Sequence, residues 1–172
     1  MILKNKLKKE MLLLKRERTD NYNFFQEKFK SMIPEDSFEI LDCDLMNIVW
    51  LNLLSLGIES RKKAVELGAV SKEITEEFPI ALKQISSLIR DSRLDPIIVL
   101  PDSWQRTGGF SINSQELANS LERIMYIYDD DLIVISNDFS NILYISGDRS
   151  GEKLYTLDVI CFGDKWNSKP NN

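Results

Sequence analysis

Leu132-Ile-Val-Ile-Ser136-Asn-Asp-Phe-Ser-Asn141-Ile-Leu-Tyr-Ile-Ser146 is the stretch of sequence that decides the fold. Two runs rich in β-branched and apolar residues flank a segment of Asn, Asp, Phe and Ser, and three of these four residue types favour turns. A third run extends from Lys153 to Phe162, and turn residues also precede it. The three runs predict an antiparallel meander.

The segment before the meander predicts one more strand and one helix. Pro96-Ile-Ile-Val-Leu100 is a short apolar run bounded by prolines, which is typical of a strand. A helix is expected from Asn113 or Ser114 to about Tyr126, with Glu116 in the position of a capping-box partner. Residues 95–166 are therefore predicted to form a β-α-β-β-β unit with the helix packed on the meander.

The N-terminal half has the pattern of helices. Leu45 to Leu56 is almost entirely apolar, which predicts a buried helix with Asp44 as its N-cap. We expect residues 31–94 to be helical and residues 1–30 to form a basic amphipathic helical head, either docked on the body or contacting a partner. The predicted fold class is α+β, in a single domain over residues 1–172 with a frayed tail at 167–172.

Charge is unevenly distributed along the chain. The 22 Lys and Arg and 27 Asp and Glu give a net charge of −5. Residues 1–30 hold nine basic and four acidic residues, so the head carries +5 and residues 31–172 carry −10. An acidic body repels phosphate, and we expect no nucleic-acid partner.

The chain contains no histidine, which restricts its possible chemistry. Ser-His-Asp and Cys-His catalysis and His-ligated zinc are excluded. Cys43 and Cys161 sit among apolar residues and are expected to be buried thiols. No secretory signal or membrane-spanning segment is evident, so we expect a cytoplasmic protein without a membrane partner.

Acidic residues near the meander are the first candidate site. Asp129, Asp130 and Asp131 follow one another where the helix is expected to meet the first meander strand, and Asp102 follows the preceding strand. Clustered carboxylates serve two-metal hydrolases, but consecutive Asp residues point in different directions and show no ligand spacing. We expect no metal and no cofactor here, and interpret these residues as a surface for a partner.

The loop Pro101-Asp-Ser-Trp-Gln-Arg-Thr-Gly-Gly-Phe110 is the second candidate site. Trp104 and Arg106 belong to the residue types that dominate protein interfaces. The loop lacks the spacing of a phosphate-binding motif. It is therefore either a structural turn that tucks Trp104 and Phe110 onto the core or a protein-binding loop.

The acidic, cytosolic α+β profile with its meander at 132–162 resembles bacterial toxin-immunity proteins of the contact-dependent growth inhibition type. The resemblance covers mainly residues 95–166 and rests on general character, so it assigns no individual residue. It implies stoichiometric inhibition of a cognate nuclease-type toxin. Such toxins are commonly basic, and an acidic inhibitor gains association rate by electrostatic steering.

The acidic body without a catalytic constellation predicts a non-enzymatic binding protein, and the resemblance implies an immunity protein whose partner is a basic toxin domain. The predicted partner-binding residues are Asp129, Asp130, Asp131, Asp102, Trp104 and Arg106. An adaptor that recruits a partner through the basic head, and a metal-dependent hydrolase that uses the scattered Asp residues, are the alternatives. The sequence leaves the oligomeric state open.

Overall fold

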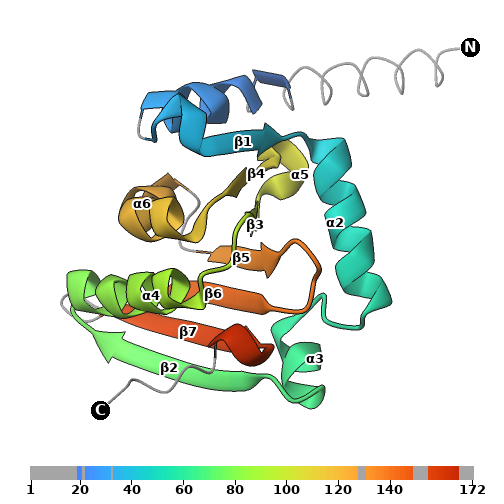
Figure 1. The fold of residues 1–172 in the computed structure, drawn as a ribbon, viewed down its shortest axis with the longest axis vertical. Coiled ribbons are helices and arrows are strands. Elements are labelled where there is room, and N and C mark those ends of the chain that lie inside the picture. The colour runs from blue at the N-terminus through green and yellow to red at the C-terminus, as the bar shows by residue number, and fades with distance from the viewer. Residues whose placement is uncertain (1–18, 21, 32, 128–130, 149–154, 167–172) are drawn as a thin grey trace, which may run out of the picture.

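Seven strands form one antiparallel sheet in the order β1-β4-β3-β5-β6-β7-β2 (Figure 1). The computed structural model describes residues 19–20, 22–31, 33–127, 131–148 and 155–166. The strands are β1 (Phe38–Leu41), β2 (Val70–Glu76), β3 (Ile97–Pro101), β4 (Gly109–Ile112), β5 (Asp131–Ser136), β6 (Ile142–Asp148) and β7 (Tyr155–Phe162). The helices with defined bounds are α2 (Cys43–Ser55), α3 (Arg61–Glu66), α4 (Phe78–Ser92), α5 (Trp104–Thr107) and α6 (Ser114–Ile127), with short 3₁₀ turns η1 (Glu35–Ser37) and η2 (Asp164–Trp166).

The predicted α+β class and the predicted meander are both confirmed. β5 pairs with β6 and β6 with β7, each in antiparallel register, so that Tyr144 lies opposite Ile133 on one side and Ile160 on the other. α6 also begins as expected, because the Asn113 side chain accepts a hydrogen bond from the Glu116 N–H at 2.7 Å. The four-residue turn after Ser136 closes the first hairpin of the meander.

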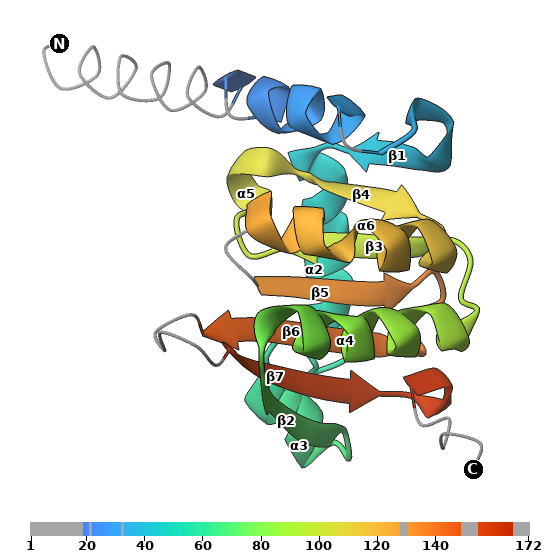
Figure 2. The same ribbon diagram turned by 90° about the vertical axis from the view of Figure 1, so that its left-hand side faces the viewer.

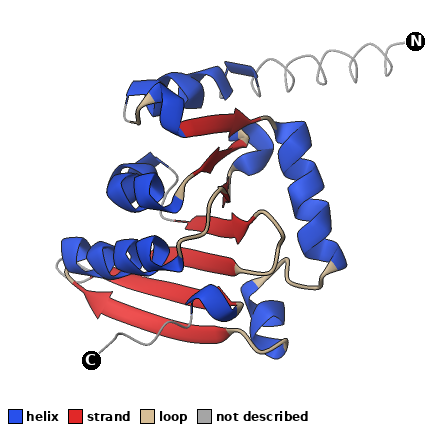
Figure 3. Cartoon of the chain, viewed as in Figure 1, coloured by secondary structure: helices blue, strands red, loops and turns tan. Residues whose placement is uncertain are grey.

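The expectation that residues 31–94 are helical is wrong at two places (Figure 3). β1 and β2 both lie in this half, at opposite edges of the sheet, and each pairs with a single neighbour. Only Ile74 is buried in β2, whose other residues are exposed. An edge strand with one buried residue lacks the alternating apolar pattern of a half-buried strand. The short helix α5 and the strand β4 add two further elements to the predicted β-α-β-β-β unit.

Alternate residues of the central strands enter two separate cores. Val99, Val134 and Leu143 point to the side of the sheet covered by α4 and α6. Their neighbours Leu100, Ile135 and Tyr144 point to the other side, which α2 and α3 cover. Both faces of the sheet are therefore buried, which explains why the strand sequences read as continuous apolar runs.

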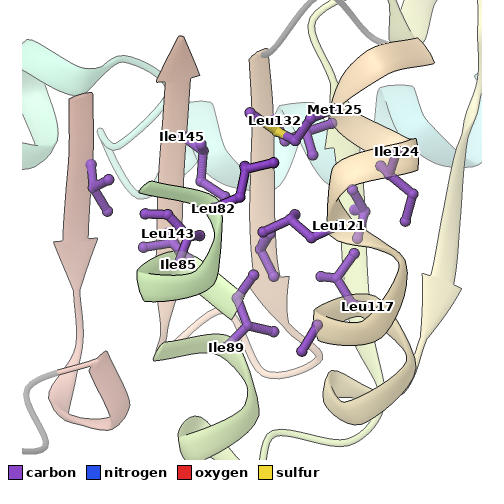
Figure 4. Packing of buried hydrophobic residues seen from close by; sticks show 14 of the residues in the cluster. Leu82, Ile85, Ile89, Leu117, Leu121, Ile124, Met125, Leu132, Leu143 and Ile145 are labelled. Atoms are coloured by element: carbon purple, nitrogen blue, oxygen red, sulfur yellow. The ribbon is translucent and has the colours of Figure 1, made fainter. Parts of the chain in front are cut away.

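The larger core lies beneath α4 and α6. Apolar residues at helical spacing on both helices meet β5 and β6, as Figure 4 shows. The labelled residues are Leu82, Ile85, Ile89, Leu117, Leu121, Ile124, Met125, Leu132, Leu143 and Ile145. Each is at most 4% exposed. Figure 2 shows the two helices in front of the sheet and α2 behind it, crossing the strands.

α2 differs from the fully buried helix that its composition predicts. Asp42, not Asp44, is its N-cap, and the Asp42 carboxylate accepts the N–H groups of Asp44 and Leu45 at 2.9 Å each. Met46, Val49 and Leu53 are buried against the sheet, whereas the opposite side of the helix faces solvent. A helix that is apolar all round gives no sequence signal for which side is covered.

The described part of the N-terminal head, helical at residues 22–31, docks on the body. Phe29 is 3% exposed, and its ring centroid lies 4.4 Å from that of Phe110 in β4. Residues 1–18, which carry most of the predicted basic helix, and the predicted tail at 167–172 lie outside the described residues.

Both cysteines are buried, as expected for small apolar side chains. Burial raises the pKa of the Cys161 thiol to about 11, and the nearby positive charge of Lys72 offsets only part of this effect. Among the helices in the described ranges, none has the length and apolar character needed to cross a bilayer.

Candidate functional site

A cavity of about 490 Å³ opens where β3 ends and β5 begins, on the side of the sheet that α2 covers. This volume is in the range of small-ligand sites. Its lining comes from α2, the start of α3, the β3–α5 turn and the strands β5 and β6. The lining residues are Trp50, Glu59, Ser60, Arg61, Pro101, Asp102, Trp104, Gln105, Asp131, Leu132, Ile133, Tyr144 and Ile145.

Three of the six predicted site residues meet in this cavity. Asp102 and Asp131 are brought together because β3 and β5 are neighbours, and the Asp102 N–H donates to the Asp131 carbonyl at 3.3 Å. Trp104 begins α5 and is 8% exposed. The sequence left two interpretations of this loop open, a structural turn and a protein-binding loop. Trp104 is compatible with both, because it packs on the core and lines the cavity.

Of the other three predicted residues, the structure describes only Arg106. Arg106 is exposed on α5 and is not among the lining residues of the cavity. Asp129 and Asp130 lie outside the described residues. Within the described ranges, no group of three Cys, Asp or Glu side chains is placed to hold a metal ion.

The Gly-Gly pair of this loop is used for close packing. Gly108 adopts a φ of +71°, and a Cβ there would overlap the carbonyl oxygen of Leu41. A Cβ on Gly109 would overlap the Met46 sulfur and the Val99 carbonyl oxygen. The two glycines allow β4 to lie directly beneath α2, which places Trp104 and Trp50 on the same side of the sheet.

Arg61 closes one side of the cavity. Its guanidinium donates to the Asp131 carboxylate at 3.0 Å and joins the start of α3 to the start of β5. The two side chains are 37% and 41% exposed, so this ion pair contributes only a fraction of a kcal/mol, up to about 1, to stability. Its main effect is to orient the Asp131 carboxylate at the mouth.

Glu59 and Tyr144 supply polar atoms at the buried side of the cavity. Glu59 forms an ion pair with Lys63 through Oε1, and its side chain is 13% exposed. Tyr144 is 3% exposed. Among the described residues, neither Glu59 Oε2 nor the Tyr144 hydroxyl has a hydrogen-bond partner.

The protonation states of these two groups are set by their surroundings. The hydrogen bond from Lys63 lowers the pKa of Glu59, so this carboxyl is ionised at neutral pH. Burial, together with the negative charge of Glu59, raises the pKa of Tyr144 well above its usual range. At neutral pH the cavity lining therefore includes an ionised carboxylate at Glu59 and a neutral hydroxyl at Tyr144.

Two indole rings form an aromatic wall. The ring centroids of Trp50 and Trp104 are 6.1 Å apart, with an interplanar angle of 35°. No sequence pattern indicated Trp50, Glu59, Arg61 or Tyr144 as site residues. Trp50 belonged to an apolar run, Tyr144 to a strand and Arg61 to a basic segment, and none of these contexts indicates a site.

A second surface lies on the solvent side of α2, away from the sheet. We define the α2 outer face as Leu45, Ile48, Leu51 and Leu54. These four side chains are 42% to 55% exposed. Several large apolar residues clustered on one helix surface are typical of an interaction site, whereas single exposed apolar residues are common on any protein.

No protein-family model, curated protein or solved structure matches this chain. The cavity and the α2 outer face are therefore the two features of the described structure that bear on function.

Proposed function

We propose that this chain is a non-enzymatic immunity protein that binds a basic, nuclease-type toxin domain in the cytosol and neutralises it. The observation that carries the proposal is the α2 outer face, which exposes four large apolar side chains on the helix whose Trp50 lines a cavity with three carboxylates. An apolar patch next to acidic groups suits a partner with a mixed apolar and basic surface.

The apolar part of this surface supplies the binding energy. Each Leu or Ile side chain of the α2 outer face gains about 1–2 kcal/mol if a partner removes its exposed half from water. A cluster of such side chains on a single helix is the geometry by which helices contribute to protein interfaces.

The charge distribution supports a basic partner. Residues 31–172 carry a net charge of −10, and Asp42 and Asp44 lie exposed at the start of α2 next to the apolar face. Opposite charge on the partner increases the association rate and disfavours acidic competitors. Occlusion of a nuclease surface that binds phosphate is the expected mode of inhibition.

Co-expression with the product of the adjacent gene tests this proposal. We expect that product to arrest growth when expressed alone, and to be inhibited by and co-purify with this protein. Replacing two side chains of the α2 outer face (Ile48→Ser with Leu51→Ser) should abolish co-purification and protection while leaving the thermal unfolding temperature nearly unchanged.

The matched control is Ile80→Ser, because Ile80 is 46% exposed on α4, which covers the opposite side of the sheet. Protection should survive this change. A neighbouring product that is harmless alone, or protection that survives the α2 double substitution, would contradict the proposal.

A further inference from the structure

Two residues that line the cavity, Glu59 and Tyr144, each carry a buried polar oxygen that points to a ligand that donates hydrogen bonds. Within the described part of the chain, Glu59 Oε2 and the Tyr144 hydroxyl are shielded from solvent and have no partner. A buried polar atom without a partner is destabilising, and most buried polar atoms in proteins are paired. Nothing in the fold requires a hydroxyl at Tyr144, since a phenyl ring fills the same space.

The charges around these atoms favour a cation. Three carboxylates, those of Glu59, Asp102 and Asp131, line the cavity. Two cations oppose them: Arg61, which is held by Asp131, and Lys63, which is bound to Glu59 from the exposed side. The carboxylates therefore remain in excess by one charge.

The walls of the cavity favour an organic cation rather than a metal ion. The rings of Trp50 and Trp104 lie side by side, and indole faces attract guanidinium and ammonium groups more strongly than other aromatic rings do. Buried Tyr144 adds a third ring to the lining. A planar guanidinium suits such a site because it stacks on aromatic faces and carries five N–H donors.

We propose that this cavity binds an organic cation that carries several N–H donors, a guanidinium group above all, with Glu59 and Tyr144 as its buried hydrogen-bonding partners. The cation is either an arginine side chain of a polypeptide or a free guanidine compound. The assignment of this cation to an arginine of the basic partner rests on the proposed function. The cation site itself does not.

The direct test is a titration of the isolated protein with N-acetyl-L-arginine methylamide. Tryptophan fluorescence and calorimetry measure the binding. Two of the three tryptophans line the cavity, so occupancy changes the emission. We expect saturable binding, and binding at least tenfold weaker for the neutral isostere N-acetyl-L-citrulline methylamide. Agmatine distinguishes the sources: tighter binding of agmatine indicates a free compound, and tighter binding of the peptide-like probe indicates a side chain.

Variants connect the binding to the proposed atoms. Glu59→Gln and Tyr144→Phe should each weaken the arginine probe about tenfold or more, because the first removes the negative charge that attracts the cation and the second removes a hydrogen-bonding oxygen. Tyr144→Phe should leave the unfolding temperature unchanged or raised, since no residue in the described ranges hydrogen-bonds the hydroxyl. Glu122→Gln is the matched control, because Glu122 is exposed on α6 at the other side of the sheet.

Equal binding of the arginine and citrulline probes, or no saturable binding of either, would overturn the cation site. Unchanged affinity in both Glu59→Gln and Tyr144→Phe would do the same. These results do not depend on a partner or on the α2 outer face, so they are independent of the test by co-purification and protection.

Discussion

Asp138 holds the turn between β5 and β6 through its carboxylate. Oδ1 accepts hydrogen bonds from the Ser136 hydroxyl at 2.6 Å, the Ser140 hydroxyl at 2.7 Å and the Ser140 N–H at 3.0 Å. These bonds, led by the one from Ser136, lower the pKa of Asp138 to about 2. The ionised form is therefore the one that the folded turn binds.

The sign of the resulting pH dependence follows from this lowered pKa. The unfolded carboxyl titrates near pH 4, so the stabilising contribution of Asp138 is complete above that pH and is lost as the pH falls towards 2. We predict that Asp138→Asn lowers the unfolding temperature at pH 7 and that the difference from wild type shrinks between pH 4 and 2. Thermal melts across this range measure both effects.

Ser140→Ala provides the comparison, because it removes one of the hydroxyl donors and keeps the carboxylate. Its melts should shift in the same direction by a smaller amount. Identical melting of Asp138→Asn and wild type at pH 7 would show that the carboxylate does not stabilise the turn.

At the level of single residues, the sequence indicated only part of the candidate site. Asp102 and Trp104 stood out because they occupy a polar loop after a strand, where functional residues are common. Glu59 and Tyr144 did not stand out, since their importance arises from one buried oxygen on each side chain that no described residue hydrogen-bonds. Burial of this kind depends on which distant segments surround a residue, and no local pattern records it.

The contact between β4 and α2 depends on Gly109. A methyl group at this position would overlap both Met46 in the helix and the backbone of β3. We predict that Gly109→Ala lowers the free energy of unfolding by about 1–3 kcal/mol, the usual cost of forcing an extra carbon into a packed core. Denaturant unfolding followed by circular dichroism gives this value.

The control is Ser111→Ala, because Ser111 lies in the same strand and is only half-buried. It should change the free energy of unfolding by less than about 0.5 kcal/mol, as surface substitutions do. Equal stability of Gly109→Ala and wild type would mean that α2 moves away from β4 without penalty.

At the level of elements, β3, β5, β6 and β7 were predictable, whereas the edge strands β1 and β2 and the short inner strand β4 were not. β5, β6 and β7 are buried on both faces, so composition alone identifies them. β2 is an edge strand with a single buried residue, and its pairing with β7 joins Ile74 to Leu157, far apart in sequence. The prediction for α2 was wrong in the opposite sense. Its apolar composition predicted a fully buried helix, but the core covers only one side of it.

On the scale of the whole molecule, the cavity is a product of topology. Its lining is drawn from five separate stretches of the chain, between Trp50 and Ile145, which become neighbours only when β3, β5 and β6 align and α2 crosses them. The sequence predicted the meander at the centre of this arrangement. The strand order places the β3–α5 turn beside it, and this order results from contacts that are distant in sequence.

Phe29 attaches the described part of the N-terminal head to the body. The ring packs against Phe38 and Phe110, at centroid distances of 5.8 and 4.4 Å, and belongs to the core beneath α4 and α6. We predict that Phe29→Ala lowers the free energy of unfolding by about 3–5 kcal/mol while unfolding remains a single transition. Phe24→Ala is the control, because Phe24 is 52% exposed on the same helical segment, and its effect should stay below about 1 kcal/mol. Denaturant titrations followed by tryptophan fluorescence and by circular dichroism should coincide for both variants. A small effect of Phe29→Ala, or two separate transitions, would mean that the segment is an appendage free to recruit a partner, which is the arrangement that the adaptor hypothesis requires.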